Sequence, residues 1–140
     1  MSSFQKNDWT YQNKLFTEND IDNNYGFVYS IENTLTNRKY IGKKLFWSSK
    51  TKQVNKKKKR YKAPSDWQDY YGSSNELNKD VEDLGKEHFT REILYFCKSK
   101  AECSYIEARE QFTHRVLESA DYYNGHIQVR VHGSHIKSKI

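Results

Sequence analysis

Apolar and polar positions alternate most clearly near residue 25, where the chain reads YGFVYSIE. Side chains of a strand point to opposite faces in turn, so this alternation predicts a strand over residues 25–32. The polar run NTLTN then supplies turn residues, and a second apolar stretch ending in LFW covers residues 38–47. The pattern therefore predicts a β-hairpin. One face of its first strand carries Tyr25, Phe27, Tyr29 and Ile31.

A helix and a further strand are predicted next. Residues 73–84 are typical of a helix, because Leu77, Val81 and Leu84 recur at helical spacing. Residues 88–96, HFTREILYF, have few polar interruptions and are typical of a strand buried on both faces.

The longest predicted helix covers residues 99–118. Its apolar stripe, expected to face the core, comprises Tyr105, Phe112 and Val116. Glu107 lies off this stripe, a position that suits a side chain facing a site and equally one facing solvent. After the helix, Asn124 and Gly125 form a turn signal, and the alternation over residues 127–131 is compatible with a short last strand.

The order β-β-α-β-α predicts an α/β (α+β) fold, with a small, mainly antiparallel sheet of three strands flanked by helices. We divide the chain into an N-terminal extension over 1–24, one domain over 25–125 and a C-terminal tail over 126–140. The extension has no clear period and is expected to pack loosely or to mediate self-association. Residues 48–65 are expected to form a loop, and residues 66–72 a short helix or turn.

Positive charge is concentrated in one block. The net charge is +6, yet residues 36–62 hold twelve Lys or Arg and no acidic residue, which leaves twelve basic and eighteen acidic residues elsewhere. Such segregation favours an anionic partner such as DNA, although a solvated mobile loop or a nuclear localisation run would have the same composition. The candidate DNA contacts are Lys44, Lys50, Lys52, Lys56, Lys57, Lys58, Lys59, Arg60 and Lys62.

Other classes of protein fit the sequence poorly. No apolar run reaches the roughly 18 residues of a membrane helix, and the N-terminus lacks the apolar stretch of a secretory signal. Two cysteines, Cys97 and Cys103, do not make a disulfide framework, and their spacing is unlike that of zinc sites. We therefore expect an intracellular, reduced protein whose cysteines lie in the core.

Several short motifs occur together in the chain. FVY at 27–29 is followed after ten residues by YIG at 40–42, and further along come YIEARE at 105–110 and YYN at 122–124. This combination resembles the GIY-YIG nuclease family, including small bacteriophage homing-type endonucleases. The resemblance covers roughly residues 25–125. It implies a hydrolase that cuts DNA, in the cytoplasm of a host cell if a phage encodes it.

The resemblance also implies roles for individual residues. Tyr29 and Tyr40 correspond to the two motif tyrosines. Tyr29 is expected to act as the general base or to position the attacking water, and Tyr40 to give polar support. Glu107 corresponds to the glutamate that binds a divalent ion, Mg²⁺ or Mn²⁺, and Asn124 to an asparagine that supports the site. Taken alone, the tyrosines suit cross-strand packing better than catalysis, and only the whole set of motifs reverses this. Asn124 suits a turn and a functional role equally.

The chain departs from the family pattern after YIG. The family places an arginine in the following helix, whereas this chain has no arginine between Tyr40 and Arg60. Arg60 is the first candidate replacement, because arginine contacts phosphate in bidentate fashion, and Lys43 or Lys44 is the alternative. The family's histidine is also missing here, unless Tyr70 or Tyr71 replaces it.

The sequence thus predicts a metal-dependent DNA endonuclease. A non-catalytic nucleic-acid-binding module that keeps the fold is the first alternative, and a protein whose lysines bind an acidic partner is the second. One site cuts one strand, so a double-strand break requires a homodimer, a higher homo-oligomer or two successive nicks.

Overall fold

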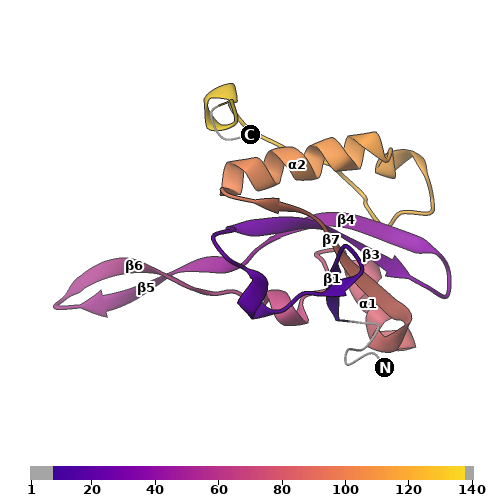
Figure 1. Ribbon diagram of the computed structural model, residues 1–140, viewed down its shortest axis with the longest axis horizontal. Coiled ribbons are helices and arrows are strands. Elements are labelled where there is room, and N and C mark those ends of the chain that lie inside the picture. Colours follow the sequence, from indigo (N-terminus) through magenta and orange to yellow (C-terminus); the bar gives the residue numbers. More distant parts are fainter. Residues whose placement is uncertain (1–7, 138–140) are drawn as a thin grey trace.

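The computed structural model describes residues 8–137 (Figure 1). Its centre is a five-stranded sheet in the order β2-β1-β7-β3-β4. The strands are β1 (Trp9–Tyr11), β2 (Lys14–Leu15), β3 (Gly26–Asn33), β4 (Arg38–Leu45) and β7 (Phe89–Cys97). The mixed class of the fold is confirmed. The predicted sheet of three strands is wrong, because β1 joins it parallel to β7 and β2 pairs antiparallel with β1.

The predicted first hairpin is confirmed as β3 and β4. The two strands pair antiparallel over their whole length, and Tyr29 lies directly opposite Gly42. The Asn33 side chain accepts a hydrogen bond from the backbone N–H of Leu35 at 3.0 Å, which shapes the turn between the strands. β7 then pairs with the other edge of β3, so β4 is left as an edge strand of the sheet.

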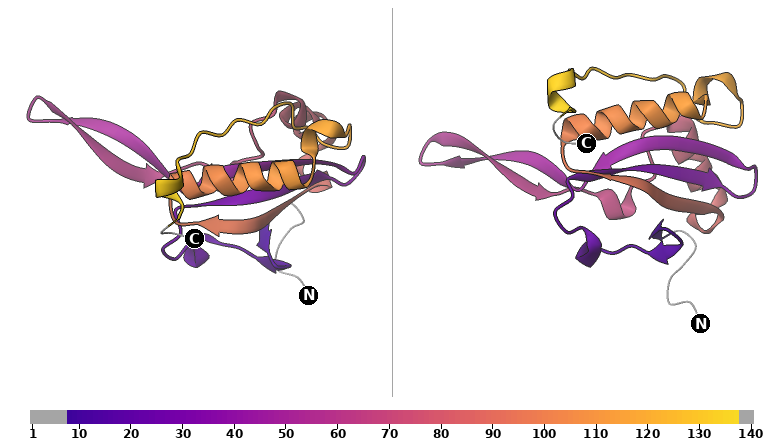
Figure 2. Two further views of the ribbon diagram at one scale, coloured as in Figure 1. Left: turned by 90° about the horizontal axis from the view of Figure 1, so that it is seen from above. Right: turned by 45° about the horizontal axis from the view of Figure 1, so that its top comes forward.

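Two helices cover opposite faces of the sheet. Figure 2 shows α2 (Lys100–Thr113) along one face and the N-terminal segment beneath the other. One core cluster joins Phe27 to Leu77 of α1 (Asn75–Leu84), and a second joins Val28 to Ile106 of α2. Because Phe27 and Val28 are neighbours on β3, the alternation of that strand supplies both cores.

The predicted apolar face of the second helix is wrong at Tyr105 and Phe112, whereas Val116 is buried in the core as expected. Phe112 and Tyr105 are exposed, with 63% and 41% of their surface accessible, whereas Cys103, Ile106 and Gln111 are buried against the sheet. The helix also ends at Thr113, and a short 3-10 turn (η4, Val116–Glu118) follows.

The N-terminal segment, where it is described, packs on the sheet. Trp9 is 3% exposed, and its indole N–H donates to the carbonyl of Trp67 at 2.8 Å. Phe16 is also buried, among the aromatic rings of Phe46, Trp67 and Phe96. Residues 9–16 therefore contribute to the core, while residues 1–7 of the proposed extension lie outside the described part.

The segment expected to be a basic loop is instead a second hairpin. β5 (Trp47–Val54) pairs antiparallel with β6 (Lys57–Pro64), and this ribbon projects from the body of the molecule (Figure 1). Asn55 and Lys56 form the two-residue turn with positive φ angles of 51° and 64°. Such a turn matches the twist of a hairpin.

The remaining connections are short. The short helix expected near residue 67 is present as η2 (Trp67–Asp69), and η1 (Glu18–Asp20) and η3 (Lys86–His88) are similar single turns. The strand expected over 127–131 does not form, and the chain runs back along α2 to η5 (Gly133–His135). Within residues 8–137, neither α-helix has the length and apolar character needed to cross a membrane.

Candidate active site

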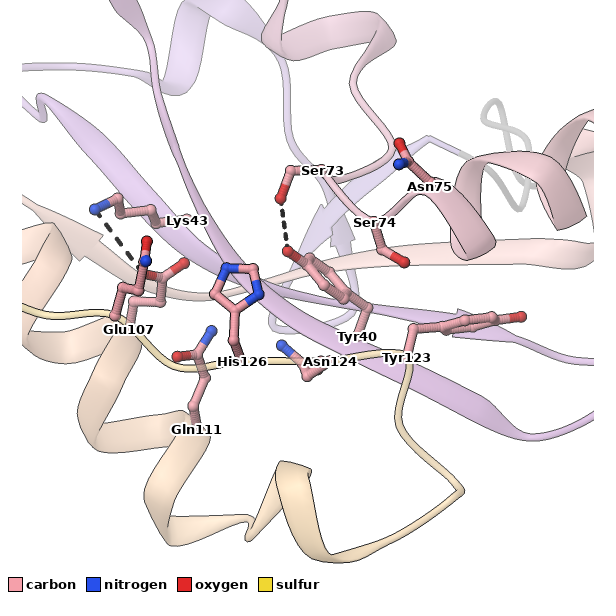
Figure 3. A pocket seen from close by; sticks show the side chains of 12 residues that line it. Tyr40, Lys43, Ser73, Ser74, Asn75, Glu107, Gln111, Tyr123, Asn124 and His126 are labelled. Carbon is pink, nitrogen blue, oxygen red and sulfur yellow. Dashed lines mark hydrogen bonds and ion pairs between the residues drawn. The ribbon is translucent and has the colours of Figure 1, made fainter.

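A cavity of about 440 Å³ lies at the free edge of β4 (Figure 3). Four parts of the chain enclose it: β4, the start of α1, the middle of α2 and the segment that follows η4. Its walls comprise Tyr40, Lys43, Ser73, Ser74, Asn75, Glu107, Gln111, Tyr123, Asn124, Gly125, His126 and Gln128. Since no further strand pairs with β4 within residues 8–137, the other three parts of the chain can pack along its outer edge. Residues far apart in the sequence therefore meet there.

Asn124 fastens the last segment to this edge. Its side-chain oxygen accepts from the N–H of Ile41 at 3.1 Å, and its amide nitrogen donates to the carbonyl of Ile41 at 2.8 Å. The Gln111 amide donates to the same carbonyl at 2.9 Å. Asn124 is 8% exposed, so these bonds satisfy polar groups that would otherwise be buried without partners. Asn124 therefore positions the walls of the cavity.

Glu107 projects from α2 into the cavity, opposite Lys43. Its side chain is only 14% exposed, and its carboxylate lies 3.9 Å from the Lys43 ammonium. Burial raises the pKa of the Glu107 carboxyl above its ordinary value, and the charges of Lys43 and His126 oppose this only in part. The ionised carboxylate is thus under-compensated, and an additional cation would stabilise it.

Lys43 of β4 is held against α2. Its ammonium group donates to the hydroxyl of Ser104 on α2 at 2.6 Å and faces Glu107 at the longer distance. About a third of the side chain, 31%, remains accessible. The ammonium charge is therefore available to an anion that enters the cavity.

The two motif tyrosines lie at different depths. Tyr40 lines the cavity, and its hydroxyl is 2.8 Å from that of Ser73. Tyr29 is 1% exposed and lies beneath Gly42. A Cβ at Gly42 would be 2.5 Å from the Tyr29 hydroxyl and 2.8 Å from the Tyr40 ring, so only glycine fits between the tyrosines.

Both hydroxyls are held in the protonated form. Burial raises the pKa of Tyr29 well above its ordinary value, and Tyr70 and Tyr40 beside it raise it further. Burial also raises the pKa of Tyr40, and the bond to Ser73 opposes this only in part. At neutral pH the two residues are therefore hydrogen-bond donors and acceptors and not phenolates.

The structure brings four of the predicted site residues to the cavity: Tyr40, Lys43, Glu107 and Asn124. Arg60 is not among them, because it lies exposed on β6, opposite Thr51. Lys44 points elsewhere, with its ammonium 2.6 Å from the carboxylate of Asp66 and above the ring of Tyr70. The other predicted DNA contacts are Lys50, Lys52, Lys56, Lys57, Lys58, Lys59 and Lys62, all on the projecting hairpin.

Sequence reasoning did not assign Ser73, Gln111 or His126 to the site. All three line the cavity, and Figure 3 shows the His126 imidazole between Glu107 and Tyr40. Their approach depends on long-range packing, so no local motif marks them. Cys97 and Cys103 are free and buried, as expected of core residues, and burial together with their mutual contact raises the pKa of Cys103.

The donor groups limit how a metal ion would be held. Within residues 8–137, no group of three or more His, Cys, Asp or Glu side chains is placed so that it could hold a metal ion. Glu107 is the one carboxylate in the cavity wall. This suits Mg²⁺, which is usually held by one or two carboxylates together with waters and substrate phosphates.

Comparisons with known proteins identify a related family. The chain matches the family model described as "Putative endonuclease segE, GIY-YIG domain" over residues 9–127. No curated protein and no solved structure matches it. The matched range begins at β1 and includes every cavity residue named above except Gln128.

Proposed function

The chain belongs to the GIY-YIG nuclease family, and from this premise we propose that it is a metal-dependent endonuclease that hydrolyses phosphodiester bonds in DNA. One observation carries the proposal: the Glu107 carboxylate, largely buried, faces a polar cavity and is paired only loosely with Lys43. A carboxylate in this position favours binding of a cation.

Glu107 would hold the ion, Mg²⁺ or Mn²⁺. The side-chain amide of Asn124 is engaged on both of its atoms by Ile41, so it serves the wall of the cavity and not the ion. When bound, the metal would polarise a phosphate oxygen and stabilise the leaving oxygen.

The chain's own residues would orient the reaction. The Tyr40 hydroxyl, fixed by Ser73, would hold the attacking water through a hydrogen bond. Tyr29, held under Gly42, would keep the Tyr40 ring in place. Lys43 would offset the negative charge that develops on the phosphate, as a preorganised cation does in a site with little water.

The family arginine has no counterpart in the cavity wall as described. Lys43 is the cation best placed to take over its charge, with His126 beside Glu107 as a second positive group when protonated. Arg60, on the projecting hairpin, is better suited to contacting DNA outside the cavity.

DNA is the substrate that fits the charge distribution. The projecting hairpin, residues 47–64, carries eight Lys or Arg and no acidic residue. Each phosphate contact from such side chains releases counterions and strengthens binding at low salt. We expect each chain to nick one strand, and a double-strand break to require a homodimer or two successive nicks. A homing or a DNA-degrading role in a bacteriophage is part of the same proposal.

Nicking of supercoiled plasmid DNA tests this function. Wild type is incubated with Mg²⁺, with Mn²⁺ or with chelator, alongside Glu107→Ala. Glu110→Ala is the matched control, because Glu110 lies on the same helix with a similarly small exposure of 12% but does not line the cavity. We expect metal-dependent nicking by wild type and Glu110→Ala, and a loss of about a hundredfold or more in Glu107→Ala.

Three results would count against the proposal. Nicking that survives in Glu107→Ala would show that the site lies elsewhere. DNA binding without nicking in any metal would favour a non-catalytic DNA-binding module. Absence of salt-dependent DNA binding would instead favour an acidic protein as the partner.

A further inference from the structure

The projecting hairpin has two chemically different faces. Residues directly opposite each other in an antiparallel pair point to the same side, and the side alternates along the strands. The register of β5 with β6 therefore assigns each side chain to a face. The face we call the reading face carries Ser49, Thr51, Gln53, Lys58, Arg60 and Lys62, with Trp47 and Pro64 at its base. The face we call the lysine face carries Lys50, Lys52, Lys57, Lys59 and Tyr61, with the small or apolar Ser48, Val54 and Ala63.

The reading face gathers the side chains that distinguish bases. Arg60 lies directly opposite Thr51, and Gln53 follows two positions along the strand. Arginine forms a bidentate pair with guanine, glutamine does so with adenine, and threonine contacts base edges or the thymine methyl group. All three are exposed, and no hydrogen bond or ion pair within residues 8–137 engages their side chains. They are therefore available to a partner.

The lysine face has a different chemistry. Its cations are all lysines, which contact phosphate as flexible point charges, and it has no arginine, glutamine or threonine. Lys52 already lies over the ring of Tyr61, with its ammonium 5.3 Å from the ring centre. Because long lysine stems can bend toward either side of a ribbon, these charges can reach phosphates that flank it.

The shape of the ribbon fits a groove of duplex DNA. Each strand has eight residues, so the ribbon is about 26 Å long at roughly 3.3 Å per residue. The major groove is about 12 Å wide and admits a two-stranded ribbon. The hairpin also stands clear of the body, as Figure 1 shows, so no other element blocks its approach.

We propose that the β5–β6 hairpin lies in the major groove of duplex DNA, with the reading face toward the base edges and the lysine face supplying phosphate contacts. It thereby sets a sequence preference. The identity of the partner rests on the proposed function. Because Lys43 lies on β4 just before the hairpin, the cut falls beside the sequence that is read, within about one helical turn of roughly 35 Å.

Selection from a library of duplexes with a randomised segment tests the proposal. Bound duplexes are sequenced without any requirement for cleavage. The variant Thr51→Val/Gln53→Met/Arg60→Lys keeps every charge but removes the groups that read bases. The matched control, Lys52→Gln/Lys59→Gln, changes two residues that lie opposite each other on the lysine face.

We expect wild type to select particular bases. In the variant Thr51→Val/Gln53→Met/Arg60→Lys, which keeps the net charge, the ratio of preferred to other bases should fall about tenfold at the positions read. The salt dependence of its binding should not change. The control should keep the preference, and its slope of log affinity against log salt should fall by about 1.8, since each contact contributes about 0.9. Equal thermal unfolding midpoints establish that all three proteins fold alike.

Two results would overturn the proposal: binding of wild type to duplexes without base preference, or an undiminished preference in the variant Thr51→Val/Gln53→Met/Arg60→Lys. Failure of the nuclease function looks different. Base preference in bound duplexes together with no nicking in any metal would refute the proposed function and leave the reading hairpin intact. Nicking at sites without base preference would refute the reading hairpin and leave the proposed function intact.

Discussion

The cavity beside β4 and the projecting hairpin use charge in opposite ways. In the cavity wall, one carboxylate faces one lysine at 3.9 Å, and the Glu107 side chain is 14% exposed. On the hairpin, eight basic side chains stand in solvent with no acidic residue among them. Burial strengthens each interaction in the cavity, whereas solvent and salt screen each charge of the hairpin.

This difference separates two kinds of effect. A half-buried group acts through its position, so a displacement of less than one ångström at the cavity changes the reaction. Exposed lysines act through their number, so the loss of one is tolerated and the loss of several is not. We therefore expect changes in the cavity to alter the rate of cleavage, and changes in the hairpin to alter affinity for DNA.

The largest effect is expected from Gly42→Ala. The new Cβ would clash with the Tyr29 hydroxyl and the Tyr40 ring, and the buried Tyr29 has no room to move. We expect cleavage to fall about a hundredfold or more and the free energy of unfolding to drop by about 1–3 kcal/mol, as in other overpacked cores. Gly133→Ala is the control, because it lies outside the cavity and its added Cβ would meet only the flexible Lys137 side chain. Single-turnover cleavage and chemical denaturation measure the two effects, and unchanged cleavage in Gly42→Ala would show that the tyrosines need no fixed geometry.

Tyr40→Phe should have the next largest effect. It removes the hydroxyl that faces the cavity but leaves the ring in the core. We expect the single-turnover rate to fall about tenfold to a hundredfold with unchanged affinity for DNA, as when one positioned donor is lost. Ser73→Ala removes only the partner of this hydroxyl and should cost less. If both substitutions lowered the rate equally, the role of holding the attacking water would belong to Ser73.

The hairpin should respond in affinity and not in rate. Replacing the four lysines of the lysine face by glutamine should weaken DNA binding about tenfold at 0.15 M salt and lower the salt slope by about 3.6. A control with the same change in net charge replaces Lys14, Lys79, Lys86 and Lys100, which are exposed elsewhere. Fluorescence anisotropy over a salt series measures both. A similar loss in the control would mean that net charge, and not the hairpin, governs binding.

The smallest effect is expected in how the free energy of unfolding of the protein depends on pH. Burial raises the folded-state pKa of Glu107, so the folded protein binds a proton there more tightly than the unfolded chain does. The free energy of unfolding contributed by this group should therefore decrease as pH rises from the unfolded pKa through the raised folded one. Glu107→Gln should abolish this decrease and be the more stable protein at neutral pH without metal. Denaturation between pH 4 and pH 8 measures it, and a wild type that is the more stable protein at neutral pH would contradict it.

Much of the fold follows from local patterns. The alternation through Phe27, Tyr29 and Ile31 gave the strand, and Ser74 and Ser99 cap the two helices through bonds to the N–H groups of Leu77 and Glu102. The nuclease family was identifiable because its motif residues keep their spacing in the sequence. These features depend on neighbours in the chain, which a single sequence contains.

The errors arise where distant contacts override local preference. β1 has only three residues, and its pairing with β7 joins positions about 80 residues apart, so no period revealed it. The hairpin was taken for a loop because lysine has low strand propensity. The face of α2 was misassigned because Gln111 is buried for its bond to Ile41, while the aromatic Phe112 is exposed.

Several residues that line the cavity could be predicted from the sequence, but which of the motif residues are buried beneath it could not. Tyr40 and Glu107, which the family motifs mark, and Lys43, which follows the YIG motif, line one cavity. That Tyr29 lies beneath Gly42, and that His126 joins the wall, depends on how the edge of β4 is covered. Asn124 makes that covering, through bonds across 83 residues of sequence.

The two strands of the hairpin pair only with each other among residues 8–137, so each has one edge with unsatisfied backbone groups. Such edges readily pair with another copy and start aggregation. Repulsion between the lysines of two copies prevents this in solution, and a polyanion that neutralises them would remove the protection. Solubility and DNA affinity therefore depend on the same side chains, and an attempt to weaken DNA binding by removing them would also expose the protein to self-assembly.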